Sequence, residues 1–161
     1  MFHVKQSQFK GCFMDNKFMK EALFEALEAE KIGEVPVGAV IVKDGKIIGR
    51  GKNFRENGND ATAHAEIVAI RDACKQLGNR HLDDCDIYIT LEPCPMCAGA
   101  IINARLKRVI FGGFDKKAGS ASNDSVIDLF SLNYNHKPEV YCGIMEKECT
   151  TPLIRFFKDK R

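Results

Sequence analysis

Long apolar runs are missing from this sequence. None approaches the roughly 20 residues of a membrane-spanning helix, so we expect no membrane segment. Residues 1–14 contain no apolar stretch followed by small residues, and a secretory signal is therefore not expected. The net charge is only +2, so the composition alone does not indicate a nucleic-acid-binding protein. Repeats and low-complexity linkers are also absent, which predicts a single domain.

The remaining composition is typical of an ordinary globular domain. The chain has 161 residues, of which 45% are hydrophobic and 29% charged, enough to bury one core. We interpret residues 1–14 as an N-terminal extension and residues 15–161 as the domain. The seven cysteines are an odd number in a chain without an export signal, which predicts reduced thiols and a cytoplasmic protein.

Patterns of strands and helices alternate along the chain after an opening hairpin. The dipeptide Asp44-Gly45 is a strong hairpin-turn signal, and residues 54–60 are rich in turn formers and predict a loop. Asp15 and Thr62 are the expected N-caps of the first two helices. The predicted strands span residues 37–43, 46–51, 87–91, 107–112 and 139–142, and the predicted helices 15–32, 63–77, 94–104, 124–130 and 146–158. This order predicts an α/β fold, a three-layer α/β/α sandwich around a five-stranded mixed sheet.

Two short motifs bring together side chains that bind metal ions. His64-Ala65-Glu66 and Cys94-Pro95-Met96-Cys97 each stand where a helix is expected to begin. Two helix N-termini can meet at one end of an α/β sheet, and their partial positive charge favours thiolates. One histidine and two cysteines leave the fourth position of a tetrahedral Zn²⁺ open to water. The sequence therefore predicts one catalytic Zn²⁺ per subunit, bound by His64, Cys94 and Cys97.

Glu66 is the candidate catalytic residue, because the three metal ligands leave its carboxylate free to move protons. The combination H-x-E…P-C-x-x-C is the signature of zinc nucleobase deaminases. In hydrolytic deamination, a carboxylate beside the water takes its proton and then protonates a ring nitrogen and the departing amine. We expect Glu66 to perform these transfers.

Other interpretations of the cysteine motif remain open at this point. Cys94-x-x-Cys97 at a strand-to-helix junction is also the setting of a thioredoxin-like redox pair. A structural zinc site would need a fourth protein ligand, for which Cys74 and Cys85 are candidates. The accompanying His64-x-Glu66 favours the catalytic metal site over both.

Longer segments of the chain resemble the bacterial tRNA-specific adenosine deaminases. The matching residues are 34–40, 53, 62–66, 90–100, 111–112, 115, 117, 119, 135–136, 143–144 and 156–158. The metal motifs alone indicate only the cytidine deaminase-like superfamily, whereas the later segments point to the tRNA enzymes. The resemblance implies the cytidine deaminase-like fold, a homodimer, and conversion of the wobble adenosine of a tRNA anticodon stem-loop to inosine. In bacteria this substrate is mainly the arginine tRNA with the anticodon ACG.

The resemblance also assigns residues to substrate binding. These are Asn53, Ala65, Val35, Leu91, Asp115, Lys117, Arg155, Phe156 and Phe157. It implies that Asn53 contacts the extruded nucleoside, that the Ala65 backbone lies near the base, and that Val35 and Leu91 form pocket walls. Asp115 and Lys117 would lie in an RNA-contacting loop, and the three C-terminal residues would contact the anticodon loop. Family members usually carry Gly-Ser where this chain has residues 120–123 (Ser-Ala-Ser-Asn).

Two competing functions fit parts of the same pattern. A deaminase of free guanine or of a cytosine nucleoside would use the same metal motifs, but it has no need of residues 115–119 (Asp-Lys-Lys-Ala-Gly) or of a basic, aromatic C-terminal helix. A zinc-stabilised RNA-binding module without turnover would need a metal site closed to water, and the intact Glu66 argues against it. The tRNA deaminase is therefore the favoured prediction.

Overall fold

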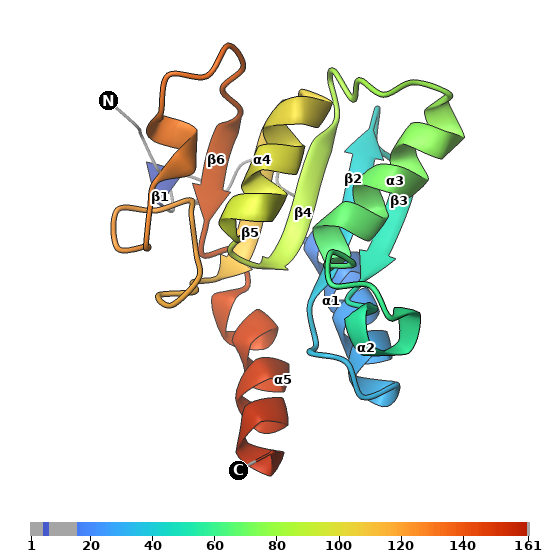
Figure 1. Ribbon diagram of the computed structural model, residues 1–161, viewed down its shortest axis with the longest axis vertical. Helices are drawn as coiled ribbons and strands as arrows, with labels where there is room; N and C mark the ends of the chain where they lie inside the picture. The colour runs from blue at the N-terminus through green and yellow to red at the C-terminus, as the bar shows by residue number, and fades with distance from the viewer. Residues whose placement is uncertain (1–4, 7–15, 161) are drawn as a thin grey trace.

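The computed structural model describes residues 5–6 and 16–160, and within these residues the strands form one mixed sheet (Figure 1). The strands are β1 (Lys5–Gln6), β2 (Gly38–Lys43), β3 (Lys46–Lys52), β4 (Asp86–Leu91), β5 (Arg108–Gly113) and β6 (Glu139–Cys142). Their order is β1-β6-β5-β4-β2-β3, with β2 antiparallel to both of its neighbours and the other pairs parallel. All five predicted strands are present, and the two-residue β1 adds a short sixth.

Helices cover both faces of the sheet, which confirms the predicted α/β/α sandwich (Figure 1). The helices are α1 (Lys17–Lys31), α2 (Arg55–Gly58), α3 (Ala65–Leu77), α4 (Pro95–Ala104) and α5 (Glu146–Asp159). Side chains alternate along β4, so Ile87 and Ile89 face α3 and α4 while Tyr88 faces α1. Helix α5 packs beside β5 and extends past the carboxyl ends of the parallel strands. None of the helices in the described residues has the length and apolar character that a membrane span requires.

Three local predictions were wrong. Residues 54–60 contain the one-turn helix α2, and residues 124–130 form only a 3-10 turn at Leu129–Ser131. The Ser125 hydroxyl in the latter segment bonds to Ser122 and to the buried Glu92 carboxylate, and these contacts compete with a helix. Thr62 does not cap α3, because its hydroxyl donates to Asp60 Oδ1 at 2.7 Å. The predicted cap Asp15 lies outside the described residues, as does most of the predicted extension 1–14.

Gly51 in β3 allows the sheet to pack directly against the first turn of α3. A Cβ atom at this position would lie 2.1 Å from the carbonyl oxygen of Ala65 and 2.5 Å from the nitrogen of Ala69. Only a residue without a side chain permits such an approach of two backbones. This contact brings the start of α3, with His64 and Glu66, close to the edge strand.

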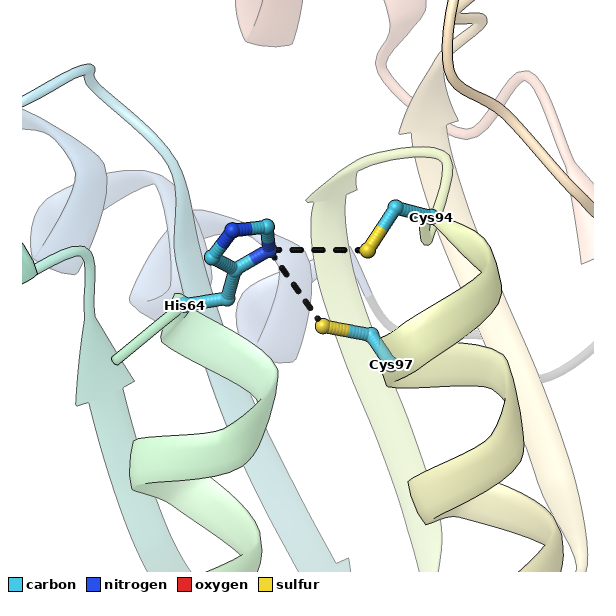
Figure 2. Close-up of side chains that lie close together, drawn as sticks. All are labelled: His64, Cys94 and Cys97. Atoms are coloured by element: carbon cyan, nitrogen blue, oxygen red, sulfur yellow. Dashed lines mark hydrogen bonds between the residues drawn. The ribbon is translucent and has the colours of Figure 1, made fainter. Parts of the chain in front are cut away.

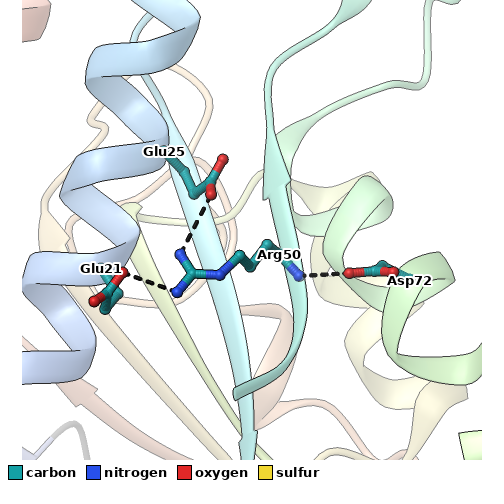
Figure 3. Close-up of polar contacts among 4 residues, drawn as sticks. All are labelled: Glu21, Glu25, Arg50 and Asp72. Atoms are coloured by element: carbon teal, nitrogen blue, oxygen red, sulfur yellow. Dashed lines mark hydrogen bonds and ion pairs between the residues drawn. The ribbon is translucent and has the colours of Figure 1, made fainter. Parts of the chain in front are cut away.

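Arg50 joins the two helical layers around the edge strand β3 (Figure 3). Its guanidinium donates to Glu21 Oε2 at 2.9 Å and to Glu25 Oε1 at 3.4 Å, both on α1. Its backbone N–H donates to Asp72 Oδ2 on α3 at 2.9 Å. Glu25 is only 9% exposed, so the cation of Arg50 compensates a carboxylate that has lost most of its water.

We expect Arg50→Ala to lower the free energy of unfolding by about 1–2 kcal/mol, because it leaves the Glu25 carboxylate without its cation. Urea denaturation measures this change. The matched control is Lys31→Ala, which breaks the exposed ion pair with Glu28 and should cost less than about 0.5 kcal/mol. Equal losses in the two variants would contradict a special role for Arg50.

Candidate active site and metal centre

His64, Cys94 and Cys97 meet where α3 and α4 begin (Figure 2). His64 directly precedes α3, Cys94 is the N-cap of α4, and Cys97 lies in its first turn. His64 Nδ1 lies 3.6 Å from Cys94 Sγ and 3.5 Å from Cys97 Sγ. The three potential ligand atoms all lie within 4.8 Å of one another, so they can bind one metal ion.

Cys74 and Cys85, the candidate fourth ligands, take no part in this cluster. Cys74 Sγ contacts the carbonyl oxygen of Arg80, and Cys85 Sγ contacts that of Asp83. Within residues 5–6 and 16–160, the group that could hold a metal is formed by one histidine and two cysteines. Three clustered ligands leave a fourth position open, whereas a structural zinc site has four protein ligands.

The two cysteine side chains differ strongly in acidity. A hydrogen bond from Cys97 and a second contact with His64 lower the pKa of Cys94 to about 4. The same contact with Cys94, together with burial, raises the pKa of the Cys97 thiol. The interaction with Cys94 also raises the pKa of His64. The lowered pKa of Cys94 favours its thiolate, which is the form that binds a metal.

Glu66 lies beside the three ligands but is not one of them. It is the second residue of α3 and is only 4% exposed. Burial, which penalises the charged form, raises the pKa of Glu66 to about 6. A carboxylate with a pKa close to neutral can both accept and return a proton, as general acid–base catalysis needs.

Asn53 holds the start of α3 in place. Its Oδ1 accepts the backbone N–H of Ala65 at 2.9 Å, and the side chain is 8% exposed. It thereby performs the capping role that the sequence assigned to Thr62. Asn53 also lines the pocket described below, so its predicted contact with a nucleoside stays a prediction.

A second buried carboxylate, Glu34, positions α2 at the rim of the site. It accepts backbone N–H groups from Arg55 at 2.9 Å, Glu56 at 3.2 Å and Asn57 at 2.8 Å. Burial would raise the pKa of Glu34, but these bonds and one from the Asn57 amide lower it overall. Glu34 thus fixes the N-terminus of α2 and places Arg55 on the pocket wall.

The metal-ligand cluster opens into a pocket of about 710 Å³ at the carboxyl ends of the parallel strands. Its lining residues are Val35, Val37, Asn53, Arg55, His64, Glu66, Leu91, Glu92, Cys94, Asp115, Lys117, Ala118, Leu153, Phe157 and Lys160. Most side chains predicted for substrate binding therefore surround one cavity. The sequence analysis assigned no role to Arg55, Glu92 and Lys160, although Glu92 lies within the matching segment 90–100.

Three residues predicted to bind substrate, Ala65, Arg155 and Phe156, are not among those that line the pocket. Arg155 binds the Glu30 carboxylate on α1, with distances of 3.1 Å from Nε and 2.6 Å from Nη2. The rings of Phe156 and Phe157 pack edge-on, and Lys160 Nζ lies over the Phe156 ring, 5.0 Å from its centre. Neither Arg155 nor Phe156 lines the pocket, and their contact with an anticodon loop stays a prediction.

We expect Asn53→Ala to destabilise the protein by about 1–3 kcal/mol, because it leaves the buried N–H of Ala65 without an acceptor. Thermal unfolding and the metal content per chain measure the effect on stability and on the site. Asn53→Asp retains the acceptor oxygen and is expected to keep most of the stability. If both variants lost the same stability, the hydrogen bond from Ala65 to Asn53 would not explain the loss.

The comparisons with known proteins agree with this geometry. A family model described as MafB19-like deaminase matches residues 13–155. The tRNA-specific adenosine deaminase of Bacillus subtilis is 47% identical over 147 residues, covering 91% of each chain. The enzyme of that name from Haemophilus influenzae is 45% identical over 91% of this chain and 85% of its own length. The chain belongs to the tRNA-specific adenosine deaminase family.

Solved structures support the fold of this deaminase. A chain from a study of A-to-I editing by wobble-position tRNA deaminases superposes with a TM-score of 0.83 at 46% identity, covering 86% of this chain and all of the other. A guanine deaminase from Bacillus subtilis has a TM-score of 0.60 at 52% identity, over 62% of this chain and 64% of its own. Relatives of both substrate classes therefore share the deaminase fold.

Proposed function

We propose that this enzyme hydrolyses adenosine to inosine at the wobble position of a tRNA anticodon, using one Zn²⁺ per subunit. The observation that carries the proposal is the buried Glu66 beside the ligand cluster, at the floor of a pocket in a chain 47% identical to a tRNA-specific adenosine deaminase. The homodimer and the cytoplasmic location stay predictions that accompany this function.

The spacing of the ligand atoms supports zinc as the metal. A tetrahedral Zn²⁺ with bonds of about 2.0 Å to nitrogen and about 2.3 Å to sulfur separates these atoms by about 3.5 Å. His64 Nδ1 lies 3.6 Å and 3.5 Å from the two sulfur atoms. Thiolate and imidazole ligands also favour zinc over magnesium, calcium or manganese.

Glu66 moves the protons of the reaction. The metal, when bound, supplies a Lewis acid that lowers the pKa of a water molecule. The Glu66 carboxylate accepts a proton from this water and delivers it to the adjacent ring nitrogen of adenine. The water oxygen bonds to the amino-bearing carbon, and the carbon–nitrogen bond to the amino group then breaks. Before this bond breaks, Glu66 takes the second proton from the added hydroxyl group and transfers it to the amino group, so that ammonia leaves and inosine remains.

The pocket wall suits a base extruded from an RNA loop. Val35, Leu91 and Leu153 provide apolar surface for the base, while Arg55, Lys117 and Lys160 provide positive charge at the same cavity. Enzymes that act on RNA bases extrude the target nucleotide and hold its flanking phosphates with basic side chains. This local charge explains how a chain of net charge +2 can bind RNA.

A guanine deaminase is the second candidate, because a 52% identical chain of that activity matches 62% of this one. Free guanine would need the same metal cluster and Glu66. It would have no use for the three basic side chains that line the pocket. We therefore place the RNA substrate first.

An anticodon stem-loop with the sequence ACG, compared with free adenosine, guanine and cytidine, tests the proposal. Ammonia release and inosine formation are the measurements, and the control RNA carries guanosine at the wobble position. We expect inosine only in the ACG stem-loop. Turnover of guanine or cytidine without any change in the RNA would support the metal chemistry and contradict the assignment of RNA as the substrate.

A further inference from the structure

Glu92 is a buried carboxylate at the pocket that the proposed chemistry does not use. It is 3% exposed and directly follows β4, two residues before the metal ligand Cys94. Its backbone N–H donates to the carbonyl oxygen of Gly113 at 2.8 Å. A carboxylate this deeply buried needs several donors to offset its lost hydration, so its partners indicate what it does.

All donors that the structure records for the Glu92 carboxylate come from residues 114–125, here called the rim loop. Oε1 accepts the backbone N–H of Asp115 at 3.1 Å, and Oε2 accepts that of Ala121 at 2.9 Å. The hydroxyls of Ser122, at 3.4 Å, and Ser125 also donate to Oε2. One side chain therefore binds both ends of the rim loop.

Two further contacts show that the rim loop is built around this carboxylate. A Cβ atom on Gly119 would lie 2.4 Å from Glu92 Oε2, so only glycine permits the approach. The hydroxyl of Ser120 donates to the carbonyl oxygen of Pro93 at 2.7 Å, and its side chain is fully buried. The rim loop is thus attached to both residues that precede Cys94. The serines of the segment that departs from the family's Gly-Ser pattern make part of this attachment.

The rim loop carries three residues of the pocket wall. These are Asp115, Lys117 and Ala118. Asp115 Oδ1 accepts the backbone N–H groups of Lys117 and Ala118, each at 3.1 Å, which folds this part of the loop into a tight turn. Because the N–H of Asp115 is itself held by Glu92, the position of the turn depends on that carboxylate.

We propose that Glu92 is a positioning residue for the substrate: it locks the RNA-contacting rim loop to the turn that delivers Cys94. The inference rests on the proposed tRNA function for its effect on RNA, but the attachment itself can be measured without RNA. Loss of the lock displaces Lys117 and its neighbours while Glu66 and the ligand cluster stay in place. It therefore weakens RNA binding more than it slows the chemical step.

Glu92→Gln in the metal-loaded enzyme is the primary test. The N–H groups of Asp115 and Ala121 donate to different oxygens of Glu92, and in glutamine one of these two atoms becomes an NH2 donor, so one of the two hydrogen bonds is lost. We expect the KM for the ACG stem-loop to rise about 10-fold while kcat falls less than about 3-fold, which is the signature of lost binding. Hydrogen–deuterium exchange should increase in residues 114–125 and remain unchanged in α3 and α4. Glu28→Gln, the same chemical change at an ion pair on α1, is the control.

Two additional variants separate positioning from a general loss of stability. Gly119→Ala places a methyl group against the Glu92 carboxylate, so it disturbs the same contact from the rim loop and should also raise the KM. In a double-mutant cycle, Lys117→Ala should weaken RNA binding in the wild type and have a smaller effect on Glu92→Gln, because Lys117 is already displaced there. Additive effects of the two changes would overturn the proposal.

The hydrogen–deuterium exchange results also test the role of Glu92. Unchanged exchange of residues 114–125 in Glu92→Gln would overturn the attachment, and increased exchange throughout the protein would reduce Glu92 to a general stabilising residue. If the wild-type enzyme did not edit the stem-loop, the proposed function would fail, and the exchange experiment would still decide whether Glu92 holds the rim loop.

Discussion

Glu66→Gln is expected to lower kcat on the ACG stem-loop by at least about 10³-fold while the metal content stays at one ion per chain, since general acid–base catalysis contributes about 10²–10⁴-fold. Glutamine has nearly the same shape, but its amide cannot accept a proton from water or return one. Glu66 is buried beside the ligand cluster and is not one of the ligands, so the change should leave metal binding intact.

Single-turnover kinetics and metal analysis on the same preparation measure this prediction. The control is Glu56→Gln, an exposed glutamate on α2 that does not line the pocket and whose backbone, not its side chain, meets Glu34. It should retain wild-type kcat. A Glu66→Gln enzyme with near-normal turnover would exclude the assigned proton transfers, whatever its metal content.

Cys97→Ala should remove the metal and, with it, all measurable deamination. Cys97 is fully buried, and its sulfur lies 3.5 Å from His64 Nδ1, so its removal leaves two of the three clustered ligands. Metal-ligand bonds contribute directly to the stability of the folded state. We therefore also expect a lower Tm than for the metal-loaded wild type.

The metal content, the Tm and the activity should be compared with those of Cys85→Ala. Cys85 is also fully buried but lies outside the ligand cluster, so this control loses packing without losing a ligand. It should keep one metal ion and its activity. Chelation of the wild type should abolish activity, and added Zn²⁺ should restore it. A Cys97→Ala protein that still bound one ion and turned over RNA would refute the ligand assignment.

Local sequence patterns correctly predicted the helices, strands and turns whose conformation depends on neighbouring residues. The hairpin at Asp44-Gly45 is present, and β6 and α5 lie close to their predicted ranges. Local signals failed where distant side chains compete for the backbone. The segment predicted as a helix at residues 124–130 is mostly irregular because Ser122 and Ser125 bond to Glu92, which is 30 and 33 residues away.

The same contrast applies to the candidate site. His64, Glu66, Cys94 and Cys97 could be predicted because short motifs place them at helix starts. The contact of Arg155 with Glu30 could not be predicted, because the two residues are 125 positions apart in the sequence. A basic residue on an exposed helix gives no local sign of whether it faces RNA or a neighbouring helix.

The sequence by itself determined the α/β class, the three metal-ligand candidates and the free carboxylate. The class follows from the order of strand and helix patterns, and the other two follow from short motifs of three or four residues. Only the tertiary structure decided how these parts are held. Asn53 caps a helix that begins 12 residues later, Glu34 binds backbone groups 21 to 23 residues away, and Glu92 binds a loop 23 to 33 residues away. Buried carboxylates and amides take whichever donors the fold brings to them, and that choice depends on the packing of the whole sheet.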